Sequence, residues 1–332
     1  MAKKIKDTDY LVISARVRAM EEHLLTRERM EQVLEARSNE DAAKILQECG
    51  YPELDASRPE AMDAALTAAR ESVLADLGDS APDARYIDIF KLKYDYHNVK
   101  AVLKARAMDT DPSRMMMDVG RVAAAVLREA LETGKTEELP GMLAAAAEEA
   151  REVLDTTRDP QLSDIVLDRW YYQELLKIAE DTGSEFLTGY VRTQIDAANL
   201  RTLVRVLRMD KSGEFLRNVL FEGGDIPADS VEKAAADRDL PALYGPTRFQ
   251  AAAQAGAEAL KGGSMTEFEK LCDDAVGDYL AIAQTVPFGE APLIGYLAAR
   301  ETEYTNLRIL LMGRNAGLDA DVIRARLRAG AQ

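Results

Sequence analysis

Histidine and cysteine, the residues that most often build metal and nucleophile sites, are scarce in this chain. Its 332 residues include two histidines and two cysteines, and Cys49 and Cys272 lie far apart, each within a helical pattern. A zinc site or a disulfide framework needs more ligands at closer spacing. The HExxH, P-loop and GxGxxG motifs are missing too. We therefore expect no catalytic, cofactor-binding or metal-binding residue, and we expect two buried free thiols.

Positive charge and long apolar runs are also in short supply. The formal net charge is -16, and nucleic acids and anionic lipids attract basic proteins, so we expect neither as a partner. The stretch from Tyr279 to Ala299 has little charge, but two prolines, a glycine and a glutamate interrupt it. A membrane-spanning helix needs about 20 continuous apolar residues, so we expect a helix, a loop and the start of another helix here. The N-terminus lacks the apolar core of a signal peptide, which favours the cytoplasm.

Strand-forming residues are rare as well, and the residues that replace them favour helix. Aromatic residues make up 6% of the chain, while alanine, leucine, glutamate and arginine dominate it. Apolar residues recur at the spacing of a helix face, as in the window from Met20 to Leu34. Two sites have the spacing of a capping box, at which a helix begins: Ser57 with Glu60 and Pro59, and Thr266 with Glu269. The sequence therefore predicts an all-α protein.

One pattern occurs three times: acid, two variable residues, asparagine, aliphatic, basic, variable, aliphatic, aliphatic. Three of the six asparagines of the chain fall at its centre, which makes coincidence a poor explanation. The acidic, asparagine and basic positions are Asp95, Asn98 and Lys100; Asp196, Asn199 and Arg201; and Glu303, Asn306 and Arg308. The asparagines are 101 (199 minus 98) and 107 (306 minus 199) residues apart.

These intervals predict three similar helical units of domain size. We expect the first repeat at 1–154, with an insertion at roughly 50–85, the second at 155–262, and the third at 263–332. Each motif is followed by a similar short segment, DVGRVAAAVLREA, GGDIPADSVEKAA and NAGLDADVIRARL.

Helical geometry assigns a role to the motif. At 100° per residue, the acid, the asparagine and the aliphatic positions share one face, which should point inward. A buried carboxylate and a buried amide need partners, most simply the unpaired backbone groups at the end of a neighbouring helix or loop. The basic position is turned away, so we expect it to be solvated. The motif is therefore interpreted as structural.

A catalytic interpretation of the first copy is the weaker alternative. The stretch KYDYHNVKAVLK places Asp95 two residues before His97, which could form an acid–base pair. Ala198 and Thr305 occupy the histidine position in the other copies, so the histidine does not recur.

Three segments resemble a known family: YLVISARVRAMEEHLLTRERMEQVLEA, FKLKYDYHNVKAVLKA and FGEAPLIGYLAARETEYTNLRILLMG. They are similar to the C subunit of the V-type or A-type ATP synthase/ATPase, which is related to the d subunit of the eukaryotic V-ATPase. The resemblance covers nearly the whole chain. It implies three similar helical domains in a pseudo-threefold, funnel-like arrangement.

The resemblance also implies a function. A protein of this kind is a non-catalytic rotor part that couples the central shaft to the membrane proteolipid ring, for proton or sodium transport linked to ATP synthesis or hydrolysis. It would lie peripherally on the cytoplasmic face of the membrane, bound through protein contacts, and be a monomer when isolated. No catalytic residue carries over from the family. A free-standing helical adaptor that docks soluble partners is the other interpretation of the same helices.

Overall fold

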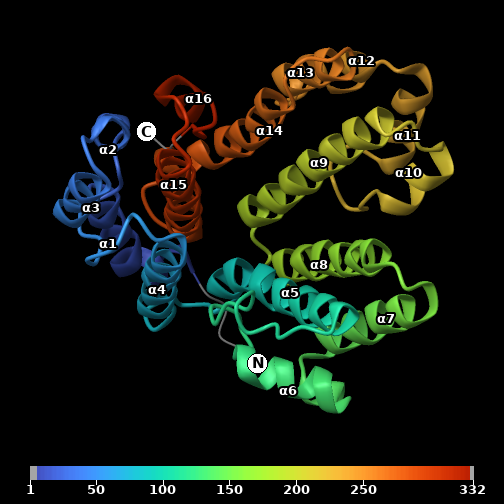
Figure 1. Ribbon diagram of the computed structural model, residues 1–332, viewed down its shortest axis with the longest axis horizontal. Coiled ribbons are helices and arrows are strands. Elements are labelled where there is room, and N and C mark those ends of the chain that lie inside the picture. The colour runs from blue at the N-terminus through green and yellow to red at the C-terminus, as the bar shows by residue number, and fades with distance from the viewer. Residues whose placement is uncertain (1–5, 330–332) are drawn as a thin grey trace. The chain divides into compact units, whose positions relative to one another are not determined.

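The computed structural model describes residues 6–329, and within them the chain is all-helical, which confirms the predicted fold class (Figure 1). The chain divides into two compact units. The larger unit comprises the described residues of Met1–Pro82, Arg192–Leu220 and Gly224–Gln332, and the smaller unit comprises Asp83–Val191 and Phe221–Gly223. The predicted boundaries of the three repeats stay a prediction.

The smaller unit is built around α5, which packs against α6, α7 and α8. The elements of this unit are α5 (Arg85–Met108), α6 (Ala124–Thr133), the short 3-10 helix η2 (Thr136–Glu138), α7 (Gly141–Thr157), α8 (Pro160–Thr182) and the first part of α9 (Glu185–Arg208). Trp170, the single tryptophan of the chain, lies on α8, and its indole N–H donates to Glu149 on α7.

The larger unit is organised around α15, which packs against helices from both ends of the chain, including α1, α2, α4 and α16. The elements of this unit are η1 (Asp7–Tyr10), α1 (Leu11–Glu21), α2 (Arg27–Glu35), α3 (Asn39–Glu48), α4 (Pro59–Gly78), the rest of α9, α10 (Gly213–Val219), α11 (Ala228–Asp237), α12 (Leu240–Tyr244), α13 (Gln250–Leu260), α14 (Met265–Leu280), η3 (Ala281–Thr285), α15 (Glu290–Asn315) and α16 (Ala320–Arg324).

The predicted interruption of the stretch from Tyr279 to Ala299 is confirmed, because α14 ends at Leu280 and α15 begins at Glu290. Among residues 6–329, no helix combines the length and the apolar character that crossing a membrane requires. Of the two cysteines, Cys272 is buried as expected, whereas Cys49 is partly exposed.

Both predicted helix starts were displaced. Helix α4 begins at Pro59, and its cap residue is Arg58, which makes no side-chain capping bond. Ser57 is not the cap, and its N–H and hydroxyl donate to the Asp55 carboxylate instead. Proline suits this first position, where no N–H is needed. Helix α14 is capped by Ser264 instead, whose hydroxyl accepts from the Glu267 N–H at 3.1 Å.

The three motifs lie on α5, α9 and α15, which are 24, 24 and 26 residues long. Each of these helices is followed by a residue in the left-handed region at the same place, eleven positions after its motif asparagine. These residues are Asp109, Asp210 and Gly317, with φ of 53°, 51° and 67°. The structural likeness of the three copies therefore extends beyond the nine residues of the motif.

Candidate functional site: three buried acid–asparagine motifs

All six acid and asparagine side chains of the motifs lie in the interior. None of them is more than 3% exposed, which places them on the inner face, where helical geometry expected them. They are Asp95, Asn98, Asp196, Asn199, Glu303 and Asn306.

Each acid accepts a hydrogen bond from a backbone N–H just ahead of a short helix. Val122 N donates to Asp95 Oδ1 at 3.1 Å, two residues before α6 begins. Ile226 N donates to Asp196 Oδ1 at 3.1 Å, two residues before α11 begins. Leu25 N donates to Glu303 Oε2 at 2.5 Å, two residues before α2 begins. The carboxylates therefore hold the loops that lead into three helices, at the end of a helix where negative charge is favourable.

The asparagines of the first and third motifs bind a second backbone segment through both ends of the amide. Asn98 donates to Met117 O and accepts from Met117 N, both at 2.8 Å. Asn306 donates to Arg328 O at 3.1 Å and accepts from Arg328 N at 2.8 Å. An aspartate could not donate and an aliphatic residue could do neither, so the amide is the side chain that fits.

Two glycines make room for the acids. A Cβ at Gly120 would lie 2.2 Å from Asp95 Oδ1, and a Cβ at Gly224 would lie 2.1 Å from Asp196 Oδ1. Both distances are far below contact distance, so a side chain at either position would displace the carboxylate from the amides that it binds.

The first and third acids are neutralised by a largely buried arginine. In the smaller unit, Arg121 bridges Asp95 at 2.7 Å and Glu174 at 2.8 Å, and the Tyr96 hydroxyl donates to Glu174 at 2.8 Å. In the larger unit, Glu303 binds Arg300 and accepts from the Tyr51 hydroxyl. Burial raises the pKa of Tyr51 and of Tyr96, and the neighbouring acid adds to each rise. Both hydroxyls therefore stay protonated and able to donate.

Asp196 is buried without such a cation. At the position that corresponds to Arg121 in the first copy, directly after the glycine, the second copy has Asp225. Burial raises the pKa of Asp196 to about 6, and the Asp225 carboxylate adds to the rise, while the N–H groups of Ile226 and Asp225 oppose it. The fully buried hydroxyl of Tyr244 makes no hydrogen bond, so it does not compensate Asp196 either. The second motif is therefore the least compensated of the three.

The basic position of each motif forms an ion pair with a different helix. Lys100 binds Asp168 on α8 at 2.5 Å, Arg201 binds Asp273 on α14, and Arg308 binds Asp63 on α4 at 3.1 Å. The Lys100 and Arg201 side chains are both 22% exposed, so the expectation of a solvated position was wrong for them. The reason is that a neighbouring helix covers this side of the motif helix, and Arg308, at 62%, is the exposed member.

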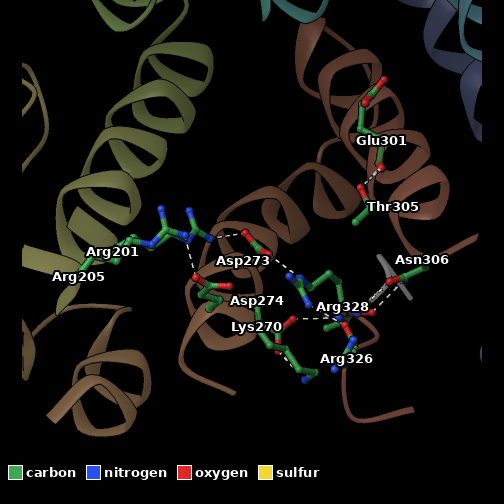
Figure 2. A network of polar contacts seen from close by, with 12 residues as sticks. Arg201, Arg205, Lys270, Asp273, Asp274, Glu301, Thr305, Asn306, Arg326 and Arg328 are labelled. Atoms are coloured by element: carbon green, nitrogen blue, oxygen red, sulfur yellow. Dashed lines mark hydrogen bonds and ion pairs between the residues drawn. The ribbon is translucent and has the colours of Figure 1, made fainter. Parts of the chain in front are cut away.

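Asp273 joins two of the motifs inside the larger unit (Figure 2). Its carboxylate binds Arg201 from the second motif and also Arg328, whose backbone is held by Asn306 of the third motif. The Ala329 N–H donates to the next residue, Asp274, at 2.9 Å. The two motifs are thus linked through one continuous polar network that also fixes the end of the described chain.

The geometry gives no support to an acid–base pair at Asp95 and His97. Asp95 is buried against the loop before α6, whereas His97 is exposed and bonds through Nε2 to Met115 O at 2.8 Å. Across residues 6–329, no three histidine, cysteine, aspartate or glutamate side chains are grouped as metal ligands. What the motifs can do is hold backbone segments in place.

Several partners of the motif were not found from the sequence. Gly120 and Gly224 had a detectable signal, because both lie four residues before the first residue of a similar helix. Arg121 and Glu174 had none, since neither recurs in the other copies. Leu25 was missed because its bond to Glu303 spans 278 residues.

The raised pKa of Asp196 predicts a pH dependence of stability. The folded pKa of about 6 lies above the ordinary value of 3.8, so the folded chain binds this proton more tightly than the unfolded chain does. The stabilisation from this proton is complete below pH 3.8 and is lost as the pH rises through about 6. It totals roughly 3 kcal/mol, at 1.36 kcal/mol per pKa unit. Relative to Asp196→Asn, which cannot titrate, the unmodified chain should gain stability on going from about pH 7 to about pH 5. Urea unfolding at the two pH values measures this difference.

Asp225→Arg is the control, because it gives the second copy the cation of the first. The substitution removes the Asp225–Arg192 ion pair, which is 3.7 Å long and has both side chains well exposed, so its loss should change the free energy of unfolding little. The variant should lower the pKa of Asp196 and flatten the pH dependence. A pH dependence unchanged by Asp225→Arg, or absent from the unmodified chain, would show that Asp196 is not the titrating group.

The profile of the ATP synthase (C/AC39) subunit family matches residues 13–326. The chain is 26% identical over 327 residues to the C subunit of a V-type sodium ATPase from Enterococcus hirae, covering 96% of this chain and 98% of the relative. It is 24% identical over 348 residues to the C subunit of an A-type ATP synthase from Methanocaldococcus jannaschii, covering 96% and 86%. The corresponding protein of the A-type ATP synthase from Pyrococcus horikoshii is 25% identical over 317 residues, covering 91% and 86%. The chain therefore belongs to the ATP synthase (C/AC39) subunit family, the non-catalytic C subunits of V-type and A-type ATPases.

Proposed function

We propose that this chain is the rotor component that couples the central shaft of a V/A-type ATPase or ATP synthase to the proteolipid ring in the membrane. The observation that carries the proposal is the family match over residues 13–326, which spans nearly the whole chain. Rotation would pass through the chain between ATP hydrolysis or synthesis in the soluble head and proton or sodium transport at the ring.

Such a coupler has to be stiff rather than reactive. Moving one charge across a membrane potential of 100 mV involves about 2.3 kcal/mol, and this work must cross both contacts of the coupler. Closely packed interiors have low compressibility and transmit strain. Supporting this role, the three motifs tie long helices to neighbouring loops through buried, charge-assisted hydrogen bonds, such as those of Asp95 and Glu303.

The proposed location is the cytoplasmic face of the membrane, reached through protein contacts. The net charge of -16 favours basic patches on the shaft and the ring over anionic lipid as the surfaces that bind the chain.

Binding to the shaft tests the proposal. Calorimetric titration of the purified chain with the co-expressed central-shaft proteins of the same organism should give saturable one-to-one binding. The affinity should fall as the salt concentration rises from about 50 to about 300 mM, because screening weakens the attraction between the acidic chain and basic patches on the shaft. The purified chain should hydrolyse no ATP.

The matched control titrates the shaft proteins into an unrelated helical protein of similar negative charge, which should give no saturable binding. A folded chain that does not bind the shaft would contradict the coupling role and favour a helical adaptor for other soluble partners. Reproducible ATP turnover by the purified chain would contradict the non-catalytic role.

A further inference from the structure

We propose that the third repeat is completed by the N-terminal part of the chain, so that residues 25–48 bind α15 as the counterpart of the segments that follow the first and second motifs. The third repeat would then combine a segment from the early part of the chain with α15 and the residues that follow it. This inference rests on the contacts of the motifs and is independent of the proposed function.

The first line of support is the residue that each acid holds. Asp95 and Asp196 bind backbone N–H groups that lie 27 and 30 residues later in the chain. Glu303 binds the N–H of Leu25, which lies 278 residues earlier. In all three cases a helix begins two residues after the bound N–H, so α2 stands where α6 and α11 stand in the other copies.

The spacing of the following elements agrees. From the first residue of α6 to that of η2 is 12 residues (136 minus 124), and the same interval separates α11 from α12 (240 minus 228) and α2 from α3 (39 minus 27). The buried positions also match, because the fourth and seventh residues of all three helices are buried. These residues are Leu127 and Ala130, Val231 and Ala234, and Met30 and Val33.

The asparagine contacts show where the loop of the third repeat is divided between two distant segments of the chain. In the first copy, Asn98 holds Met117 and Asp95 holds Val122, so the two bound residues are five apart on one continuous loop. In the third copy, Asn306 holds Arg328. The acid-bound residue of that copy, Leu25, comes from the other end of the chain. In the third motif, therefore, Glu303 and Asn306 bind two segments that lie far apart in the chain. In the first motif, one continuous loop binds both the acid and the asparagine.

Helix α16 does not fill this role. It runs over Ala320–Arg324 and so precedes Arg328, whereas α6 follows the equivalent residue, Met117. The match of NAGLDADVIRARL to the segments after the first two motifs is therefore replaced by a match of α2.

The N-terminal segment is bound as part of a core rather than as a surface attachment. Glu303 holds the N–H of Leu25 ahead of α2, and Arg314 on the same helix α15 donates to Leu34 O and Ala36 O at the far end, at 2.5 and 2.8 Å. One hydrophobic cluster includes both chain ends: residues 25–66 contribute Leu25, Met30, Val33, Leu34, Ala42, Leu46, Tyr51, Leu54, Ala56, Met62 and Leu66, and α15 and α16 contribute Tyr304, Leu307, Leu310, Leu311 and Ile323. Figure 1 shows α2 and α3 beside α15.

Hydrogen exchange on the full-length chain tests the proposal. In Glu303→Gln, the amides of residues 25–35 should exchange at least about tenfold faster, while those of α6 and α11 keep their rates, because local opening is governed by local contacts. The matched variant Asp95→Asn should accelerate α6 and leave α2 unchanged. Unchanged exchange of α2 in Glu303→Gln, or acceleration of α16 alone, would overturn the proposal.

A second measurement needs no variant, in case Glu303→Gln does not fold. Exchange of the unmodified chain in low concentrations of denaturant resolves groups of amides that open together. The proposal predicts that α2, α3 and α15 share one opening free energy. Exchange of α2 and α3 through a separate, easier opening, while α15 stays protected, would overturn it.

Discussion

Replacing Asp95 with alanine should lower the free energy of unfolding of the smaller compact unit by about 3–5 kcal/mol. The side chain is fully buried, and its loss leaves Arg121 with Glu174 as its remaining ion-pair partner and the Val122 N–H without its acceptor. Trp170 lies in the same unit, so its fluorescence during urea unfolding reports this effect.

Asp196→Ala is the matched comparison. It should lower the free energy of unfolding by less, about 1–3 kcal/mol, as measured by circular dichroism during urea unfolding at about pH 7. Asp196 also holds backbone N–H groups, but its removal leaves no buried cation behind and relieves the burial of a charge whose pKa is raised to about 6. If Asp196→Ala lowers the free energy of unfolding as much as Asp95→Ala does, the difference in charge compensation between the two copies does not affect stability. His97→Ala should be mild, because that side chain is exposed.

Gly224→Ala should destabilise the larger compact unit by about 2–5 kcal/mol. The new Cβ would lie 2.1 Å from Asp196 Oδ1 and 3.3 Å from Ile195 Cγ2, so the carboxylate has to move. Crowding of this kind typically costs about 1–3 kcal/mol, and lost hydrogen bonds to Asp225 N and Ile226 N add to it. Thermal and urea unfolding both measure the loss.

Gly277→Ala is the control within the same unit. Gly277 lies inside α14, and a Cβ there would meet no atom within 4 Å beyond its chain neighbours and the adjacent backbone of its own helix. An alanine in a helix interior is favoured over glycine by about 0.5–1 kcal/mol, so this variant should be neutral or slightly stabilised. A neutral Gly224→Ala would show that the loop before α11 can retreat from Asp196, and that the close approach has no structural role.

Properties that depend on one helix at a time could be predicted from the sequence. Composition and periodicity gave the all-α fold correctly, and the 100° rotation per residue placed Asp95 and Asn98 on the inner face of α5. Helix starts were less predictable, because the spacing of the pattern does not show that Asp55 accepts the Ser57 hydroxyl or that Ser264 caps α14.

Properties that depend on a second helix could not be predicted. Lys100 and Arg201 are turned away from the inner face, yet acids on α8 and α14 cover them. The link between Glu303 and Leu25 joins opposite ends of the chain, and a repeat search along the sequence treats those ends as separate. Sequence reasoning therefore found the motif but not what it binds.

The exchange rate of three backbone amides tests the central claim most directly. Leu25, Val122 and Ile226 precede helices rather than lying within them, so their N–H groups have no bond of a regular helix ladder. If the three acids hold these loops, residue-resolved hydrogen exchange of the unmodified chain should place all three amides among its slowly exchanging ones. Rapid exchange of these amides, at the rate of open loops, would contradict the claim that the three acids hold these loops in place.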